Sequence, residues 1–345
     1  MAENLVLYRK YRPQDFDEVI GQEHIVKTLQ NSLSSGSISH AYLFCGPRGS
    51  GKTTIARIFA KELGCDGMDL VEIDAASHTG VEDVRALIEG LQFAPVKSKY
   101  KVFIIDECHQ LSKSAANALL KTLEEPPAHA IFILATTEAS KMLATIVSRC
   151  QRFDFKRLHV SEIEKKLAFI LKKEGILAEP AVLPLIALNA RGSFRDAESL
   201  LDKCISFTAG DKLITVKEIK ELLGIVEVGQ ISKLVDFLLV KNSKDAIGYI
   251  NAMLDSGVDL QEATKTLVFY LRQCLLLKIN PEFLTPQNSG LSKEELEVIV
   301  RQITGLTEKN IQAMLEIFIE AEQKMKYATI LQLPLELAVV EICSA

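Results

Sequence analysis

The stretch "AYLFCGPRGSGKT", residues 41–53, joins a short apolar run to a glycine-rich turn and then to helix-forming residues. An apolar run of this length ahead of such a turn is typical of a buried strand. The turn matches the pattern G-x-x-x-x-G-K-T, whose glycines let backbone N–H groups surround phosphate oxygens at the start of a helix. The stretch therefore predicts a strand–loop–helix unit that binds the phosphates of a nucleotide.

The loop itself supplies most of the predicted nucleotide contacts. We expect Lys52 to contact the β- and γ-phosphates of ATP and the Thr53 hydroxyl to bind Mg²⁺. An incidental glycine-rich turn is the alternative, but it explains neither the strand before the loop nor the helix after it. The remaining loop residues of the predicted site are Gly46, Pro47, Arg48, Gly49, Ser50, Gly51 and Thr54.

A second stretch, "VFIIDECHQLS" at 102–112, places two carboxylates directly behind four apolar residues. Adjacent carboxylates at the end of a buried strand repel each other unless something compensates their charge. Beside a phosphate loop, we expect Asp106 to hold the Mg²⁺ shell and Glu107 to orient and deprotonate the attacking water. A solvated acidic turn is the alternative reading. For His109 a packing or supporting role is favoured.

The first half of the chain alternates apolar runs with helical patterns. Such alternation predicts a parallel sheet covered by helices on both faces. The predicted strands are 41–46, 69–75, 100–107, 130–138 and 151–155, and the predicted helices between them are 51–64, 81–92 and 114–125.

After Lys156 the strand signals stop. The next helix is predicted to open with a capping box formed by Ser161 and Glu164, and from residue 225 to 345 the chain reads as helical. Turns are predicted near 242–243, 255–257, 281–290 and 305. We therefore expect three domains: an α/β P-loop domain at 1–157, a small all-α domain at 158–224 and a larger all-α domain at 225–345.

Composition restricts the classes of function. Hydrophobic residues make up 48% and charged residues 25% of 345 residues, a globular balance, and the net charge of −5 gives no global basic field for nucleic acid. The sequence has neither a signal-peptide pattern nor an apolar run of about 18 residues, so we expect a cytoplasmic protein without a membrane span. Seven scattered cysteines without a C-x-x-C pair indicate reduced thiols.

Four further polar residues carry little signal by themselves. Thr136 and Thr137 end a predicted strand, where a polar group could sense the γ-phosphate, although such a pair is more often a strand residue and a cap. Arg149 in "IVSRC" and Arg195 in "RGSFRDAESLL" would each be interpreted as solvated surface charges if taken alone.

Together these pieces resemble the AAA+ ATPases and, more narrowly, the gamma/tau subunits of the bacterial DNA polymerase III clamp loader. The "SRC" and "EEPP" elements are specific to clamp-loader ATPases. The resemblance covers residues 8 to about 203 and rests on "YRKYRPQDFDEVIGQEHI", "HAYLFCGPRGSGKTTIARIFAKEL", "VEIDAASHTGVEDVR", "KVFIIDECHQLSKSAANALLKTLEEPP", "FILATTE", "IVSRC" and "GSFRDAESLLD".

The resemblance implies roles for these residues. Thr137 matches the sensor 1 position, and Arg149 matches the arginine finger that acts on nucleotide in the neighbouring subunit. Arg195 matches sensor 2, which contacts the γ-phosphate from the helical lid, and the larger helical domain would be the oligomerising collar. The implied adenine pocket comprises Arg12, Pro13, Val19 and Ile20.

The sequence also departs from the family pattern. Relatives carry a four-cysteine zinc loop after the phosphate-loop helix, whereas this chain has only Cys65 there, so no zinc is expected. Basic residues expected to face DNA are reduced to Arg85 and Lys121. The chain ends after the expected collar, without the C-terminal extension of the tau form.

The resemblance implies an ATP-hydrolysing motor subunit that opens a sliding clamp and loads it on primed DNA. Its expected partners are homologous clamp-loader subunits in a ring or spiral, the clamp, and primer–template DNA. The clamp contact is expected around 92–99 or in nearby exposed helices. One alternative is another AAA+ remodeller of the branch-migration type. A second is a non-hydrolysing scaffold subunit, which would typically lack Lys52 or the Asp106–Glu107 pair. No polymerase active site is recognisable.

Overall fold

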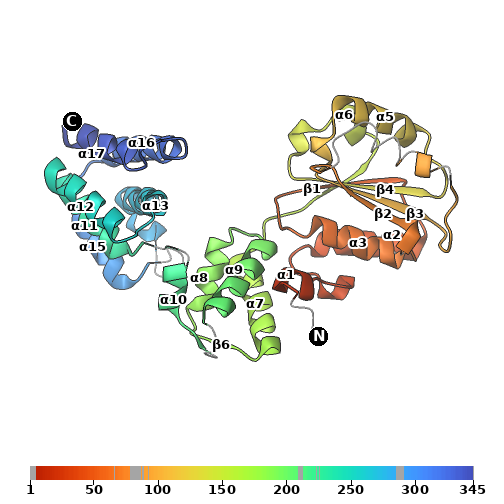
Figure 1. Ribbon diagram of the computed structural model, residues 1–345, viewed down its shortest axis with the longest axis horizontal. Coiled ribbons are helices and arrows are strands. Elements are labelled where there is room, and N and C mark those ends of the chain that lie inside the picture. The colour runs from red at the N-terminus through yellow and green to blue at the C-terminus, as the bar shows by residue number, and fades with distance from the viewer. Residues whose placement is uncertain are drawn as a thin grey trace. The chain divides into compact units, whose positions relative to one another are not determined.

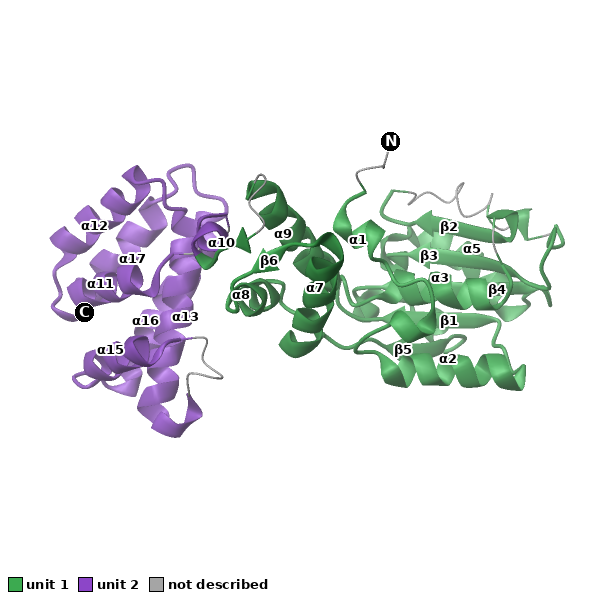
Figure 2. Ribbon diagram, turned by 90° about the horizontal axis from the view of Figure 1, so that it is seen from below, with its two compact units in different colours: residues 1–216 green, residues 217–345 purple. Residues whose placement is uncertain are grey.

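The computed structural model describes residues 5–65, 67–77, 87, 89–91, 93–208, 213–222, 224, 226–284 and 291–344. The chain divides into two compact units, residues 1–216 and 217–345, shown in green and purple in Figure 2. Most of the helix predicted over 81–92, including the candidate DNA-facing residue Arg85, lies outside the described residues. The domain boundaries after 157 and 224 stay predictions.

A five-stranded sheet forms the centre of the first unit (Figure 1). Every neighbouring pair of strands in it is parallel, in the order β2-β3-β4-β1-β5. The five predicted strands are thereby confirmed, with slightly shorter bounds: β1 Ala41–Cys45, β2 Leu70–Asp74, β3 Lys101–Asp106, β4 Ala130–Thr136 and β5 Gln151–Asp154.

Both faces of the sheet are apolar because helices cover both of them (Figure 1). Helices α2 (Glu23–Ser35) and α3 (Lys52–Glu62) pack on one face, where Tyr42 and Phe44 of β1 are buried. Helix α5 (Lys113–Glu124) packs on the other face, onto which Leu43 points. Since successive strand side chains alternate between faces, burial on both explains why "AYLFC" is apolar without a break.

The strands of this sheet are joined by short helical elements. Because all five strands run the same way, their carboxyl ends meet at one edge, where the loops after β1, β3 and β4 carry the predicted site. The remaining elements of this part are α1 Leu7–Lys10, η1 Phe16–Glu18, η2 Gly67–Asp69, η3 Cys108–Gln110, η4 Ala139–Lys141 and α6 Ala144–Val147.

The helical lid completes the first unit. It contains α7 (Val160–Glu174), α8 (Val182–Asn189) and α9 (Phe194–Phe207). A short parallel pair, β6 (Leu177–Ala178) with β7 (Leu213–Ile214), adds strands that the sequence does not signal, because two residues are too few for a hydrophobic period. Helix α10 spans Val216–Leu222.

The predicted capping box at Ser161 and Glu164 is wrong. Helix α7 begins two residues earlier, after His159, whose backbone N–H donates to Glu162 Oε2 at 2.7 Å. Glu162 thus has the role that was predicted for Glu164. Both acids lie three residues after a polar residue, so the spacing alone does not distinguish the two starts.

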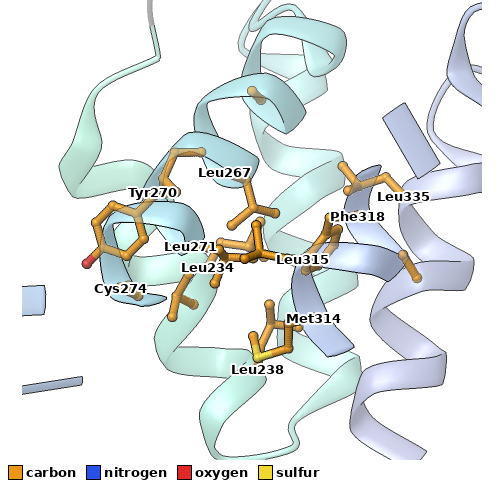
Figure 3. Close-up of a cluster of buried hydrophobic side chains, with 14 of the residues drawn as sticks. Leu234, Leu238, Leu267, Tyr270, Leu271, Cys274, Met314, Leu315, Phe318 and Leu335 are labelled. Atoms are coloured by element: carbon orange, nitrogen blue, oxygen red, sulfur yellow. The ribbon is translucent and has the colours of Figure 1, made fainter. Parts of the chain in front are cut away.

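The second unit is helical, as predicted, and its core is drawn in Figure 3. Buried side chains of α11, α13, α16 and α17 meet there, with Leu234, Leu271 and Phe318 among them. Polar side chains are buried in this unit as well. One of them, Gln302, donates to Asp236 Oδ1 at 2.7 Å and accepts from the Tyr270 hydroxyl at 2.5 Å. The elements are α11 Val228–Leu239, α12 Ser243–Asp255, α13 Leu260–Ile279, η5 Pro281–Phe283, α15 Lys293–Ile303, α16 Glu308–Met325 and α17 Leu333–Ser344.

Among the described residues, no helix is both long and apolar enough to cross a bilayer.

Candidate nucleotide-binding site

The phosphate loop leaves β1 and enters α3 at Lys52, whose side chain is only 5% exposed. Its ammonium group donates to the carbonyl oxygens of Gly46 and Pro47, each at 2.9 Å. Burial lowers the pKa of Lys52, and the nearby carboxylates of Glu107 and Asp106 oppose that shift. The loop therefore holds a buried cation at the N-terminus of a helix, an arrangement suited to anionic oxygens.

Two oxygen ligands of the kind that Mg²⁺ prefers lie together beside this cation. The Thr53 hydroxyl donates to Asp106 Oδ2 at 2.6 Å, which joins the start of α3 to the end of β3. The other carboxylate oxygen of Asp106 accepts the backbone N–H of Glu107 at 2.9 Å. A hydroxyl and a carboxylate are hard oxygen donors, so the residues present fit a magnesium ion that also binds phosphate.

Glu107 occupies a conformation that is uncommon for a residue with a side chain. Its φ of 47° and ψ of 42° lie in the left-handed region. This strained backbone conformation persists only where the surrounding contacts enforce it. Its Oε2 accepts from the Thr137 hydroxyl at 2.9 Å and from the Thr137 backbone N–H at 3.2 Å. The end of β3 and the residue after β4 thus fix one carboxylate between them.

His109 lies next to this pair and is almost fully buried. Its Nδ1 is 3.0 Å from Thr136 Oγ1 and 3.5 Å from Glu107 Oε2, and its side chain is 4% exposed. Thr136 Oγ1 also accepts the backbone N–H of Glu138 at 3.0 Å. The imidazole therefore packs behind Glu107, a position that fits the supporting role favoured from the sequence.

A pocket opens above the loop between the sheet domain and the lid. It brings together most of the sequence-predicted residues, namely Arg12, Pro13, Val19, Ile20, Arg48, Gly49, Ser50, Gly51, Lys52, Thr53, Thr54, Asp106, Glu107 and Arg195. Gly46, Pro47, Thr137 and Arg149 lie outside its wall. Six further residues of the wall were not predicted from the sequence: Tyr8, Glu18, Ile55, Lys166, Phe194 and Glu198.

Arginines concentrate positive charge in this pocket. Burial is the main cause that lowers the pKa of Arg12, and repulsion from Arg57 and Arg195 adds to it. The Arg195 guanidinium carbon lies 5.1 Å from the centre of the Tyr8 ring, a cation–π contact between the lid and the N-terminal segment. Cations that lie close together repel one another, which disfavours their charged forms. Such a cluster indicates a site for a multiply charged anion.

The lid touches the phosphate loop directly. The backbone N–H of Phe194 donates to the Gly49 carbonyl at 3.2 Å. A Cβ added to Gly49, whose φ is +73°, would lie 1.9 Å from Ser193 Oγ, so only glycine allows this approach. The start of α9, and with it Arg195, is therefore held against the loop.

Arg149 does not line the pocket of its own chain. Its guanidinium donates to Glu124 Oε1 at 2.6 Å and to the Thr145 carbonyl at 2.8 Å, and its side chain is 33% exposed. Glu124 belongs to the "EEPP" element, so the two elements specific to clamp-loader ATPases contact each other. The arrangement does not bring Arg149 together with the other predicted catalytic residues.

The remaining predictions concern DNA and zinc. Lys121 is exposed on α5. Cys65 is buried and its thiol donates to the Tyr100 carbonyl at 3.0 Å. Over the part of the chain that the structure describes, no three His, Cys, Asp or Glu residues gather as a metal site.

Gln22 is a buried residue beside the phosphate loop that was not predicted from the sequence. It is 1% exposed, and its side-chain amide donates to the Lys156 carbonyl at 2.9 Å while its oxygen accepts the Lys156 N–H at 3.3 Å. The amide nitrogen also lies 3.5 Å from the Ser50 carbonyl. The only available signal was its place in "GQE", within the stretch that resembles the clamp-loader family.

Comparison with known proteins agrees with this architecture. Residues 21–76 and 67–159 match the family described as DNA polymerase III, delta subunit. Residues 162–210 match the ATPase lid domain of the DNA polymerase III clamp loader subunit, and 214–345 match domain III of DNA polymerase III subunits gamma and tau.

Among solved structures, the branch-migration motor RuvB of Thermotoga maritima has a similar fold. It aligns with 66% of this chain and 79% of its own at a TM-score of 0.53. At 23% sequence identity, this likeness shows the fold alone.

Curated relatives match over most of the chain. DNA polymerase III subunit tau of Bacillus subtilis is 42% identical over 98% of this chain, and that of Escherichia coli is 38% identical over 94%. The chain spans 63% and 53% of the lengths of these two relatives. DNA polymerase III subunit gamma of Buchnera aphidicola is 35% identical over 99% of both chains. On this identity across two whole chains, the protein belongs to the gamma/tau subunit family of bacterial DNA polymerase III.

Proposed function

We propose that this chain binds and hydrolyses ATP as a motor subunit of the replicative sliding-clamp loader. The observation that carries the proposal is the convergence of a buried lysine, the Thr53–Asp106 pair and a lid arginine on one pocket. A scaffold subunit without hydrolysis would not need all of these groups, and Lys52, Thr53, Asp106 and Glu107 are all in place.

The phosphate loop would bind the triphosphate through charge and backbone geometry. Lys52, now bonded only to two carbonyl oxygens, would turn to the β- and γ-phosphates, whose negative charge restores its charged form. Thr53 and Asp106 would hold Mg²⁺, which when bound neutralises phosphate charge. Arg195 would reach the γ-phosphate from the lid, so that bound nucleotide adds a contact between the lid and the loop that already touch.

Glu107 would orient the attacking water and accept its proton. The hydroxyl and the backbone N–H of Thr137 both donate to one oxygen of this carboxylate. These two hydrogen bonds fix the orientation in which the carboxylate can accept the proton. In this proposal, Thr137 links the γ-phosphate end of the site to the position of the base.

Arg149 would complete the site of a neighbouring subunit. It is partly exposed and does not line its own pocket, so its proposed contact with the γ-phosphate is made across an interface. Positive charge supplied in this way stabilises the transition state of phosphoryl transfer. The proposed assembly is therefore a ring or spiral of related subunits in the cytoplasm.

The proposed partners of that assembly are the sliding clamp and primer–template DNA. A chain with a net charge of −5 carries no overall excess of positive charge for phosphates, so DNA affinity would come from several subunits together, with Lys121 and Arg85 as candidate contacts. ATP would favour the clamp-binding spiral, which requires different affinities of the two nucleotide states for the clamp.

The test is ATP hydrolysis by the chain reconstituted with its companion clamp-loader subunits. We expect hydrolysis to rise at least tenfold when clamp and primed DNA are added together, and to rise less with unprimed single strands. A hydrolysis rate that is the same with and without clamp and primed DNA would contradict the proposed function and favour a different AAA+ remodeller.

A further inference from the structure

Glu198 is a buried acid in the wall of the pocket that the proposed function does not use. It lies on α9, is 5% exposed, and faces the same space as Arg12, Lys166 and Arg195. Acidic residues are almost never buried this fully without a partner. Its presence in a site built for an anion therefore requires a reason.

Within the part of the chain that the structure describes, the carboxyl group of Glu198 has no bonded partner. Lys166 and Arg12 attract it at longer range, but the ammonium of Lys166 donates instead to the Tyr11 carbonyl at 2.9 Å. Among the described residues, none donates a hydrogen bond to this carboxyl or forms an ion pair with it. Burial is the larger effect and raises the pKa of Glu198 to about 7, against the attraction of Lys166 and Arg12.

The position of Glu198 along α9 separates it from the phosphates. The helix starts at the phosphate loop, where Phe194 bonds to Gly49, and Arg195 is in its first turn. Glu198 lies three residues further on, about 4.5 Å along the axis at 1.5 Å per residue. A carboxylate close to phosphate oxygens would be repelled, whereas this one lies in the part of the wall that Lys166 and Arg12 share.

We propose that Glu198 contacts the nucleoside half of the bound nucleotide and accepts a hydrogen bond from one of its O–H or N–H donors. A nucleoside offers two sources of such donors, the ribose hydroxyls and the amino group of the base. Either would supply the partner that the carboxyl lacks in the pocket, and would favour its ionised form. Glu198 would then select nucleotides by their donors, while Lys52 and Arg195 hold the phosphates.

This inference rests on the proposed nucleotide site, and the experiment separates the two. Calorimetry would measure the affinity for ADP with Mg²⁺, which avoids hydrolysis, and for 2′-deoxy-ADP, 3′-deoxy-ADP and IDP, in which an oxygen replaces the amino group. The variants are Glu198→Leu, Glu198→Gln and, as a matched control on the same helix, Asp202→Asn.

The wild type should lose about tenfold in affinity for one of the three analogues, the size expected for a hydrogen bond to a charged group. Glu198→Leu should lose about tenfold for ADP itself and lose nothing more for that analogue, because the partner is already gone. Asp202→Asn should behave as the wild type. The analogue that shows this pattern identifies the donor as a ribose hydroxyl or the base amino group.

The inference would be overturned if Glu198→Leu bound ADP as tightly as the wild type, or if every analogue lost the same factor in both proteins. Absence of ADP binding by the wild type would instead defeat the proposed function. Glu198→Gln guards against misfolding of the leucine variant. Between pH 8 and 6 the wild type should lose more ADP affinity than Glu198→Gln, and equal losses would also contradict the inference.

Discussion

Lys52 is a cation removed from water, and among the described residues two carbonyl oxygens accept hydrogen bonds from its ammonium group. Such a group costs folding free energy in the empty pocket, because burial disfavours its charged form more than the nearby carboxylates restore it. At the scale of the residue, Lys52 therefore favours ligand binding and lowers the folding stability of the ligand-free protein.

Replacing Lys52 by methionine should separate these two effects. We expect Lys52→Met to lower ATP hydrolysis in the reconstituted complex at least a hundredfold, while the melting temperature of the nucleotide-free chain stays equal or rises. Lys61→Met, an exposed lysine on the same helix, should leave hydrolysis near the wild-type rate. A melting temperature that falls by several degrees would show that Lys52 stabilises the fold instead.

Glu198 gives the nucleotide-free chain a pH dependence of known sign. Its pKa is about 7 in the folded protein against an ordinary value of 4.5, so between these pH values the folded state binds more protons than the unfolded state. Stability must then fall as pH rises through this window, by about 3 kcal/mol at most. Urea unfolding should show that Glu198→Gln gains more stability at pH 8 than at pH 5. An equal gain at both would contradict the raised pKa.

The contact between the phosphate loop and α9 belongs to the scale of the element. Gly49 and Gly51 both have positive φ, +73° and +99°, so alanine at either costs about 1 kcal/mol of backbone strain. Only at Gly49 would the new Cβ also collide with the lid, at Ser193.

Gly49→Ala should therefore lower the melting temperature of the nucleotide-free chain clearly more than Gly51→Ala does. Adding Ser193→Gly should recover part of the loss, since it removes the two nearest atoms of the collision. Differential scanning fluorimetry suffices as the measurement. Equal losses for the two glycine variants would mean that the lid does not rest on the loop.

At this scale, much of the fold could be predicted from the sequence. Strands such as β1 and β4 are apolar throughout because helices bury both of their faces, and that signal is strong and local. The start of α7 could not be located, because two acids stand at equivalent spacing and the surrounding fold decides between them. Glu198 could not be recognised for a similar reason. Its position three residues after Arg195 predicts that the two share a helix face, but it does not predict which residues pack against that face.

At the scale of the whole molecule, the chain has two compact units with separate hydrophobic cores. Since the pocket proposed to bind nucleotide lies entirely in the first unit, a ligand should stabilise that unit alone. Calorimetric melting should show two transitions, of which ADP at 100 times its dissociation constant shifts only one, by the equivalent of about 2.7 kcal/mol. Lys52→Met should abolish the shift. Movement of both transitions together would show that the units unfold as one.

The role of Arg149 can be established neither from the sequence nor from the structure of one subunit. Its sequence context resembles an arginine finger, yet within the chain it pairs with Glu124 and stays outside the pocket. The proposal therefore depends on an interface in which Arg149 leaves Glu124 for a phosphate of the neighbouring subunit.

The most direct measurement is ATP binding and hydrolysis by Arg149→Ala in the complex reconstituted with clamp and primed DNA. The matched control is Arg152→Ala, which removes a nearby exposed arginine that pairs with Asp154 on its own chain. We predict that Arg149→Ala binds ATP as the wild type does but hydrolyses it at least a hundredfold more slowly, while Arg152→Ala keeps both properties. Hydrolysis by Arg149→Ala at the wild-type rate would contradict the account of a motor whose sites are shared between subunits.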